Sequence, residues 1–85
     1  MRGSGPIRVN AAVVYGYFTI DAGTVRLRLS CDEWDGLGLS EGQRVTVVLP
    51  DGEPQHLMIL SAARTPPFVW LEMQSQTGWE AGQFW

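Results

Sequence analysis

The sequence predicts an all-β protein, a small barrel of about five strands with one short helix. Two observations lead to this fold class. Runs rich in Val, Ile, Leu, Tyr and Phe alternate with short turns that contain glycine or proline. Within them, residues 24–49 follow the order strand, capped helix, glycine turn, strand. That order is typical of a small closed or half-closed barrel.

The chain has 85 residues, 45% of them hydrophobic, which is enough for one domain with its own core. We expect residues 1–6 to be a flexible N-terminus, residues 7–74 to form the barrel and residues 75–85 to be an aromatic C-terminal tail. No apolar run approaches the roughly 20 residues of a membrane span. The chain also begins without the apolar stretch of a signal peptide. We therefore expect a cytoplasmic protein that does not contact membranes.

The first predicted strand covers residues 7–20, which exceeds the usual length of about five or six residues. We expect a bend or bulge at Gly16 to accommodate this length. Residues 21–23 then form a turn in which Gly23 can adopt a positive φ.

Residues 24–29 form the next predicted strand, because apolar and polar residues alternate there strictly. The apolar side chains of Val25, Leu27 and Leu29 face the core. Arg26 and Arg28 face outward from the opposite side of the strand.

A short helix is predicted at residues 31–37. Ser30 and Glu33 have the spacing of a capping box, in which each side chain satisfies the backbone amide of the other residue. Gly38 is placed to end the helix in the left-handed conformation. We expect Trp34 to point from this helix into the barrel and to plug it.

The rest of the barrel is predicted from alternating segments separated by turns. The strands are expected at residues 44–49, 55–60 and 68–74. A hairpin turn at residues 50–53 joins the first two of them. Residues 61–67 are expected to be a loop, stiffened by two consecutive prolines. In the last strand we expect Trp70 to lie in the core.

Residues from about 15 to 60 carry a longer pattern: a strand, the turn ending in Gly23, the strand VRLRL, a capped helix, then Leu37-Gly38-Leu39, two residues and Gly42. This pattern resembles the swapped-hairpin unit of AbrB/MazE-type proteins and the half-unit of double-psi (cradle-loop) barrels. The resemblance implies a barrel, and it implies a DNA-binding transcriptional regulator or an antitoxin-like protein as one function. Double-psi barrels contain two such units per chain, and one clear copy is present here. Either two chains combine, or the flanking strands complete a different, SH3-like barrel.

The charge distribution departs from that resemblance. DNA-binding AbrB-like proteins are strongly basic on the face that meets the duplex, whereas this chain carries 6 arginines, no lysine and 9 acidic residues, a net charge of −3. Such a balance disfavours binding to nucleic-acid phosphates. For this alternative function the candidate contacts are Arg8, Arg26 and Arg28. Otherwise Arg26 and Arg28 belong to a solvated strand face.

We predict that the chain is not an enzyme and needs no cofactor. It contains no phosphate-binding glycine loop, no nucleophile elbow and no paired-carboxylate motif. A zinc site within one chain is not expected, because Cys31 is the single cysteine and His56 the single histidine. A barrel that binds a small molecule or acts as an enzyme is a third alternative, and His56 and Cys31 are the only candidate site residues for it.

The aromatic tail supports the leading hypothesis. Three large rings, Trp79, Phe84 and Trp85, lie in a glycine-containing segment without clear periodicity. Such rings either fold back over an open barrel end or dock on another subunit or partner. We therefore expect a non-catalytic binding or assembly module that acts through protein–protein contacts, including self-association, with Trp79, Phe84 and Trp85 as its partner-binding residues.

Overall fold

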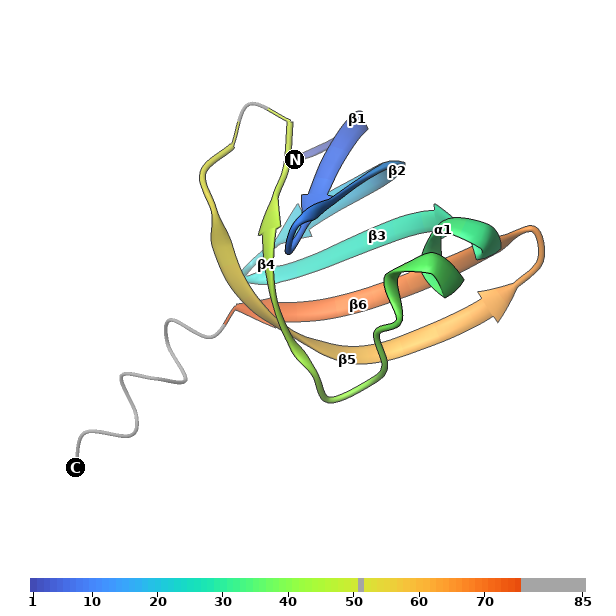
Figure 1. The fold of residues 1–85 in the computed structure, drawn as a ribbon. Helices are drawn as coiled ribbons and strands as arrows, with labels where there is room; N and C mark the ends of the chain where they lie inside the picture. Colours follow the sequence, from blue (N-terminus) through green and yellow to red (C-terminus); the bar gives the residue numbers. More distant parts are fainter. Residues whose placement is uncertain (51, 76–85) are drawn as a thin grey trace.

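The computed structural model describes residues 1–50 and 52–75, which form a closed barrel of six strands with one short helix (Figure 1). The strands are β1 (Arg2–Val9), β2 (Ala12–Asp21), β3 (Thr24–Ser30), β4 (Arg44–Val48), β5 (Gln55–Thr65) and β6 (Phe68–Ser75). The helix α1 (Cys31–Leu37) lies between β3 and β4 in the chain. Around the barrel the strand order is β1-β2-β3-β6-β5-β4, and the described neighbours pair antiparallel. The predicted all-β barrel with one short helix is confirmed.

The barrel interior is filled by apolar side chains from all six strands. Alternation along β3 works as predicted, since Val25, Leu27 and Leu29 are at most 1% exposed. On the neighbouring strands, the residues that pair with Leu27 are Phe18 of β2 and Leu71 of β6, and both are buried too. The core is therefore continuous across the β2–β3–β6 part of the barrel.

The prediction of one long strand at residues 7–20 was wrong. A turn at Asn10 and Ala11 divides this run into β1 and β2, and Asn10 has a φ of 54°. Asparagine tolerates this left-handed conformation better than most residues. The Asn10 side-chain oxygen also accepts a hydrogen bond from the Thr46 amide, 3.0 Å away, so the turn is attached to β4. The split raises the number of strands from about five to six.

The expected boundary between a flexible N-terminus and the barrel at residue 7 also needs correction. Residues 2–6 belong to β1 and pair with β2, from Arg2 opposite Thr19 to Pro6 opposite Tyr15. The segment carries two glycines and a serine, and on composition alone it does not predict a strand. The segment is extended because it pairs with β2, and its own residues have little preference for a strand.

Gly16 is needed for close packing, and the expected bulge is not found there. The β1–β2 register runs without a shift through the pair Gly5–Gly16. A Cβ atom on Gly16 would lie 2.6 Å from the backbone oxygen of Arg28 and 2.8 Å from a methyl carbon of Leu29. β3 therefore approaches β2 here more closely than any side chain would permit.

The turn before β3 and the capped helix after it agree with the sequence prediction. Ala22 and Gly23 have φ values of 50° and 86°, as a two-residue type I′ hairpin requires. At the other end, the Ser30 side chain accepts a hydrogen bond from the Glu33 amide at 3.1 Å, and Gly38 ends α1 with a φ of 66°.

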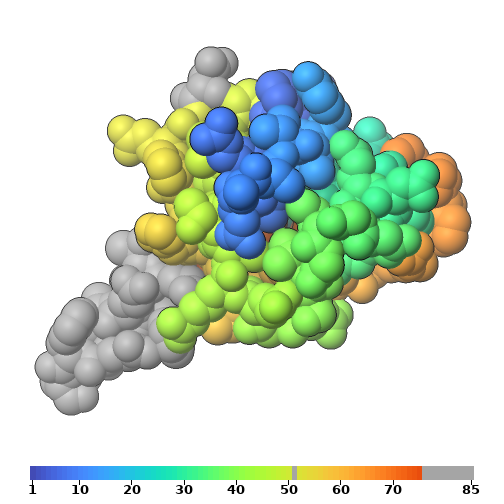
Figure 2. All heavy atoms as spheres, in the orientation of Figure 1, coloured from blue at the N-terminus to red at the C-terminus, as the bar shows by residue number. Residues whose placement is uncertain are grey.

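The carboxylate of Glu33 does more than complete the cap. One of its oxygens accepts a hydrogen bond from the Ser30 hydroxyl at 3.1 Å, and the other accepts one from the Tyr15 amide of β2 at 2.9 Å. The predicted contact with the Ser30 amide is replaced by these two. Glu33 thus ties α1 to the β1–β2 hairpin, and Figure 2 shows the green segment around α1 lying against the blue hairpin.

Replacing Glu33 by alanine should lower the free energy of unfolding by about 1–2 kcal/mol, because the Tyr15 amide loses its acceptor. Asp32→Ala is the matched control: Asp32 is an exposed carboxylate in the same first turn, and its loss should cost about 0.5 kcal/mol. Urea denaturation of both variants measures the difference. Equal losses would show that the Tyr15 contact contributes nothing.

Trp34 covers the core instead of plugging it. Together with Leu37 and Leu39 it packs against the core cluster, but all three remain half-buried, and no residue of α1 is fully buried. In Figure 1 the helix lies beside β3 near the turn between β5 and β6.

The predicted loop at residues 61–67 is wrong for residues 61–65, because β5 continues to Thr65, and only residues 66–67 form the turn. The register with β6 shifts between Ile59 and Ser61, so Leu60 is the extra residue of an irregularity. Beyond it Ala62 is half-buried and packs against the core cluster. The shift breaks the two-residue period, which is why the alternation in the sequence stops at this point.

Candidate functional site

A group of aromatic side chains surrounds one arginine on the outer face of β2, β3 and β6. Across these strands Tyr17 pairs with Arg28, and Arg28 pairs with Trp70. Tyr15 and Phe68 lie two residues before Tyr17 and Trp70, and therefore on the same face. We call Tyr15, Tyr17, Arg28, Phe68 and Trp70 the aromatic patch.

Arg28 is the centre of the aromatic patch. Its guanidinium carbon lies 4.6 Å from the ring centre of Phe68, 5.5 Å from that of Tyr17 and 5.8 Å from that of Trp70. All three distances are within the about 6 Å of a cation–π contact. Among residues 1–50 and 52–75, no carboxylate lies within ion-pair distance of Arg28 and no acceptor takes a hydrogen bond from its side chain. The rings hold the cation in place while its N–H groups have no acceptor in this part of the chain.

The aromatic patch is unusually exposed for rings of this size. Tyr15 is 68% exposed, Trp70 40% and Phe68 38%. A hollow of about 400 Å³ lies beside them, and Glu33 lines it together with Arg28. The patch thus offers apolar surface and one positive charge at the edge of a concave site.

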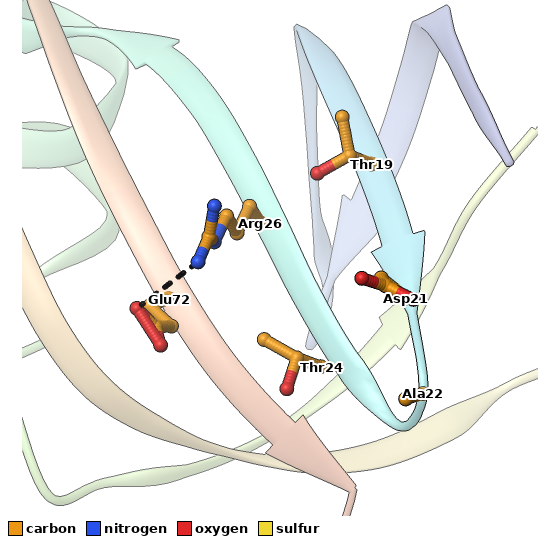
Figure 3. Close-up of a pocket in the computed structure, with 6 residues that line it drawn as sticks. All are labelled: Thr19, Asp21, Ala22, Thr24, Arg26 and Glu72. Atoms are coloured by element: carbon orange, nitrogen blue, oxygen red, sulfur yellow. Dashed lines mark ion pairs between the residues drawn. The ribbon is translucent and has the colours of Figure 1, made fainter.

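A second hollow, of about 380 Å³, continues along the same face toward the β2–β3 turn (Figure 3). It is lined by Thr19, Asp21, Ala22, Thr24, Arg26 and Glu72. Arg26 and Glu72 point toward each other across β3 and β6, with 4.0 Å between Nη2 and Oε1. Both side chains are largely exposed, so this ion pair contributes little to stability. Arg26 therefore has a counter-charge within the fold, in contrast to Arg28.

The three arginines predicted as nucleic-acid contacts do not form one cluster. Arg26 and Arg28 share the outer face of β3, as predicted. Arg8 is exposed on β1, where it pairs with Val13 and Val48. Arg28 pairs with Tyr17 of β2, and Tyr17 pairs in turn with Ser4 of β1. Arg8 lies four residues beyond Ser4 along β1, away from Arg28.

The two candidates for chemistry, His56 and Cys31, have separate partners. His56 is exposed on β5, and its Nδ1 lies 3.2 Å from the Thr46 hydroxyl. The Cys31 thiol donates a hydrogen bond to the Phe68 carbonyl oxygen at 3.6 Å. In the described part of the chain, no group of three His, Cys, Asp or Glu side chains is arranged to hold a metal ion. None of its helices has the length and apolar character needed to cross a membrane.

One further ion pair links α1 to β5, between Asp35 and Arg64. The hydrogen bond that Arg64 donates to Asp35 raises the pKa of Arg64 above its usual value. Both side chains are on the surface, and the pair has the role of a structural contact.

Sequence reasoning missed most of the aromatic patch. It assigned Trp70 to the core, although Val69, Leu71 and Met73 alternate with Phe68 and Trp70 and are the buried set. This alternation can be read from the sequence and places Trp70 on the outer face. That Trp70 lies beside Arg28, however, depends on the pairing of β3 with β6. The predicted partner-binding residues Trp79, Phe84 and Trp85 lie outside the described residues.

Comparisons of the chain with known proteins found no relative. No family model matches the chain, and neither a curated protein nor a solved structure is similar enough to match it.

Proposed function

We propose that the chain is a non-catalytic binding module of the cytoplasm that acts through protein–protein contacts at the aromatic patch. The observation that carries this proposal is Arg28, held against three rings of which Phe68 and Trp70 are each about 40% exposed. Trp, Tyr and Arg are the residues most enriched at binding hot spots. The residues of the aromatic patch belong to the paired strands β2, β3 and β6, so their backbones lose little conformational entropy when a partner binds.

A second candidate is single-stranded nucleic acid. Bases stack on exposed aromatic rings, and an arginine can contact the phosphate. The local charges favour a protein instead: Glu33 lines the same hollow as Arg28, Glu72 lies next to Arg26 on the same face, and the chain has a net charge of −3. The swapped-hairpin DNA regulator is weakened further, because Arg8 lies apart from Arg26 and Arg28.

The proposal predicts that peptides selected from a random displayed library bind at the aromatic patch. In the double variant Phe68→Ala/Trp70→Ala the selected peptides should bind at least about 30-fold more weakly, since two hot-spot rings are lost. Val13→Ala is the control, because Val13 is 55% exposed and lies outside the patch. Far-UV circular dichroism verifies that each variant is folded.

Two results would contradict this prediction. Selected peptides that bind the double variant as tightly as the wild type would move the binding surface elsewhere. Arg28-dependent binding of a fluorescent single-stranded oligonucleotide that weakens steeply with salt, without peptide binding, would make the second candidate the function.

A further inference from the structure

The positive charge of Arg28 restricts what can bind at the aromatic patch. Within the described residues its guanidinium contacts rings but no carboxylate and no hydrogen-bond acceptor. A planar guanidinium forms its strongest contacts with carboxylates, through two parallel hydrogen bonds. The ligand that fits therefore carries a carboxylate close to an apolar or aromatic group.

Two other occupants fit less well. A symmetric pair of patches, with a two-fold axis through their centres, would place the Arg28 charges of two copies opposite each other. A polyanion such as nucleic acid would bring further phosphates toward Glu33 in the same hollow and toward Glu72 beside Arg26. One isolated carboxylate avoids both costs.

The chain itself contains a segment of this chemistry. Glu80 is the single acidic residue among residues 76–85, and it directly follows Trp79. We propose that Trp79 and Glu80 of one copy bind the aromatic patch of another copy. The Glu80 carboxylate contacts Arg28, and the Trp79 indole packs on the exposed rings of Phe68 and Trp70. This inference rests on the proposed function and names its partner.

The length of the chain favours binding between copies over binding within one copy. Arg28 pairs with Trp70, which lies five residues before Ser75 along β6, about 17 Å at the usual strand rise. Glu80 follows Ser75 by five residues, and a chain that reverses direction spends about two of them on a turn. The remaining three span about 10 Å at most, so the backbones of Glu80 and Arg28 stay about 7 Å apart along the strand, a gap that their side chains can bridge. The ring contact decides between the two arrangements. Phe68 lies seven residues before Ser75, about 24 Å away, whereas Trp79 follows Ser75 by four residues, two of which the turn uses, so the Trp79 backbone stays about 17 Å short of Phe68, beyond the reach of an indole.

Such a contact joins two different surfaces, so it is head-to-tail. Each bound copy still presents a free patch and a free segment, which permits chains or closed rings of copies. The assembly expected from the tail aromatics and the patch found in the structure then belong to one interface.

A labelled peptide tests the contact. The probe is residues 76–85 with a fluorescein at its N-terminus and an amidated C-terminus, so that Glu80 carries its one carboxylate. We expect the full chain to bind it, and Arg28→Met to weaken binding at least about tenfold, the usual effect of losing a charge-assisted hydrogen bond. A peptide with Glu80→Gln should lose a similar factor, and the two changes together should cost little more than either one. Arg26→Met is the matched control, two residues away on the same face, and should change the affinity less than about twofold.

The outcomes separate this inference from the proposed function. If library peptides bind the patch but the 76–85 peptide neither binds nor displaces them, the function stands and the inference is overturned. Equal binding of the 76–85 peptide to the wild type and to Arg28→Met would also overturn it. In sedimentation velocity, the wild-type mass should rise above 9.4 kDa with concentration, whereas Glu80→Gln should shift this rise to at least about tenfold higher concentration. A wild-type mass that stays constant up to about 1 mM would overturn the contact between copies.

Discussion

Gly16→Val is expected to destabilise the barrel by about 3 kcal/mol, at the upper end of the cost of overpacking. The reason is backbone contact: a Cβ on Gly16 would lie 2.6 Å from the Arg28 carbonyl oxygen, and a main-chain oxygen cannot move aside as a side chain can. For a domain of this size the melting temperature should fall by roughly 12–24 °C. Thermal unfolding followed by circular dichroism measures the shift.

Gly36→Ala is the control for this variant. A Cβ at Gly36 meets nothing within 4 Å, and the residue lies in α1, where alanine is favoured over glycine by up to about 1 kcal/mol. Stability should therefore rise or stay unchanged. If Gly16→Val melted at the wild-type temperature, the close approach of β2 and β3 at this point would be wrong.

Leu27→Ala should cost about 3 kcal/mol or more, within the range found for buried leucines. Leu27 is fully buried and lies between Phe18 and Leu71 across the strands, so the missing atoms leave a cavity in the centre of the core. Because small domains unfold with about 5–15 kcal/mol in total, this single loss removes a large share of it. The midpoint of urea unfolding should fall while the slope stays constant.

Val13→Ala provides the comparison for Leu27→Ala. Val13 is an apolar strand residue as well, but it is 55% exposed, and its truncation should change stability by about 0.5 kcal/mol or less. A loss for Leu27→Ala no larger than that of Val13→Ala would contradict the proposed position of the core.

The parts of the fold that the sequence predicted correctly depend on neighbours in the chain. The turn at Ala22 and Gly23 and the Gly38 helix end each require a few adjacent residues, and both were found as expected. The same holds for the hydrogen bond from the Glu33 amide to the Ser30 side chain, although the Glu33 carboxylate contacts other groups than the Ser30 amide. The buried set of β3 follows from simple alternation. Local signals of this kind can be read without knowledge of the partner strand.

The incorrect predictions concern features that depend on pairing between strands. Asn10 turns the chain and attaches it to β4, 36 residues further along the sequence, and Leu60 is accommodated by a register shift against β6, so both depend on how the segment pairs with another strand. The same is true of the aromatic patch, which exists because β3 lies between β2 and β6. The alternation of residues 69–73 indicates which side chains face the core, but alternation alone does not place Trp70 beside Arg28.

The narrowest closure of the barrel lies between β1 and β4. Among the described residues, the pairs Arg8–Val48 and Val9–Val47 join these strands, with Asn10 and Thr46 beside them. Strands held by so few bonds separate before the longer ladders do, and separated edges invite pairing with foreign chains. Proline cannot donate to such a ladder, and two prolines lie along this border, Pro6 within β1 and Pro50 packed against Gly5. The weakest border of the barrel is thereby also a poor template for aggregation.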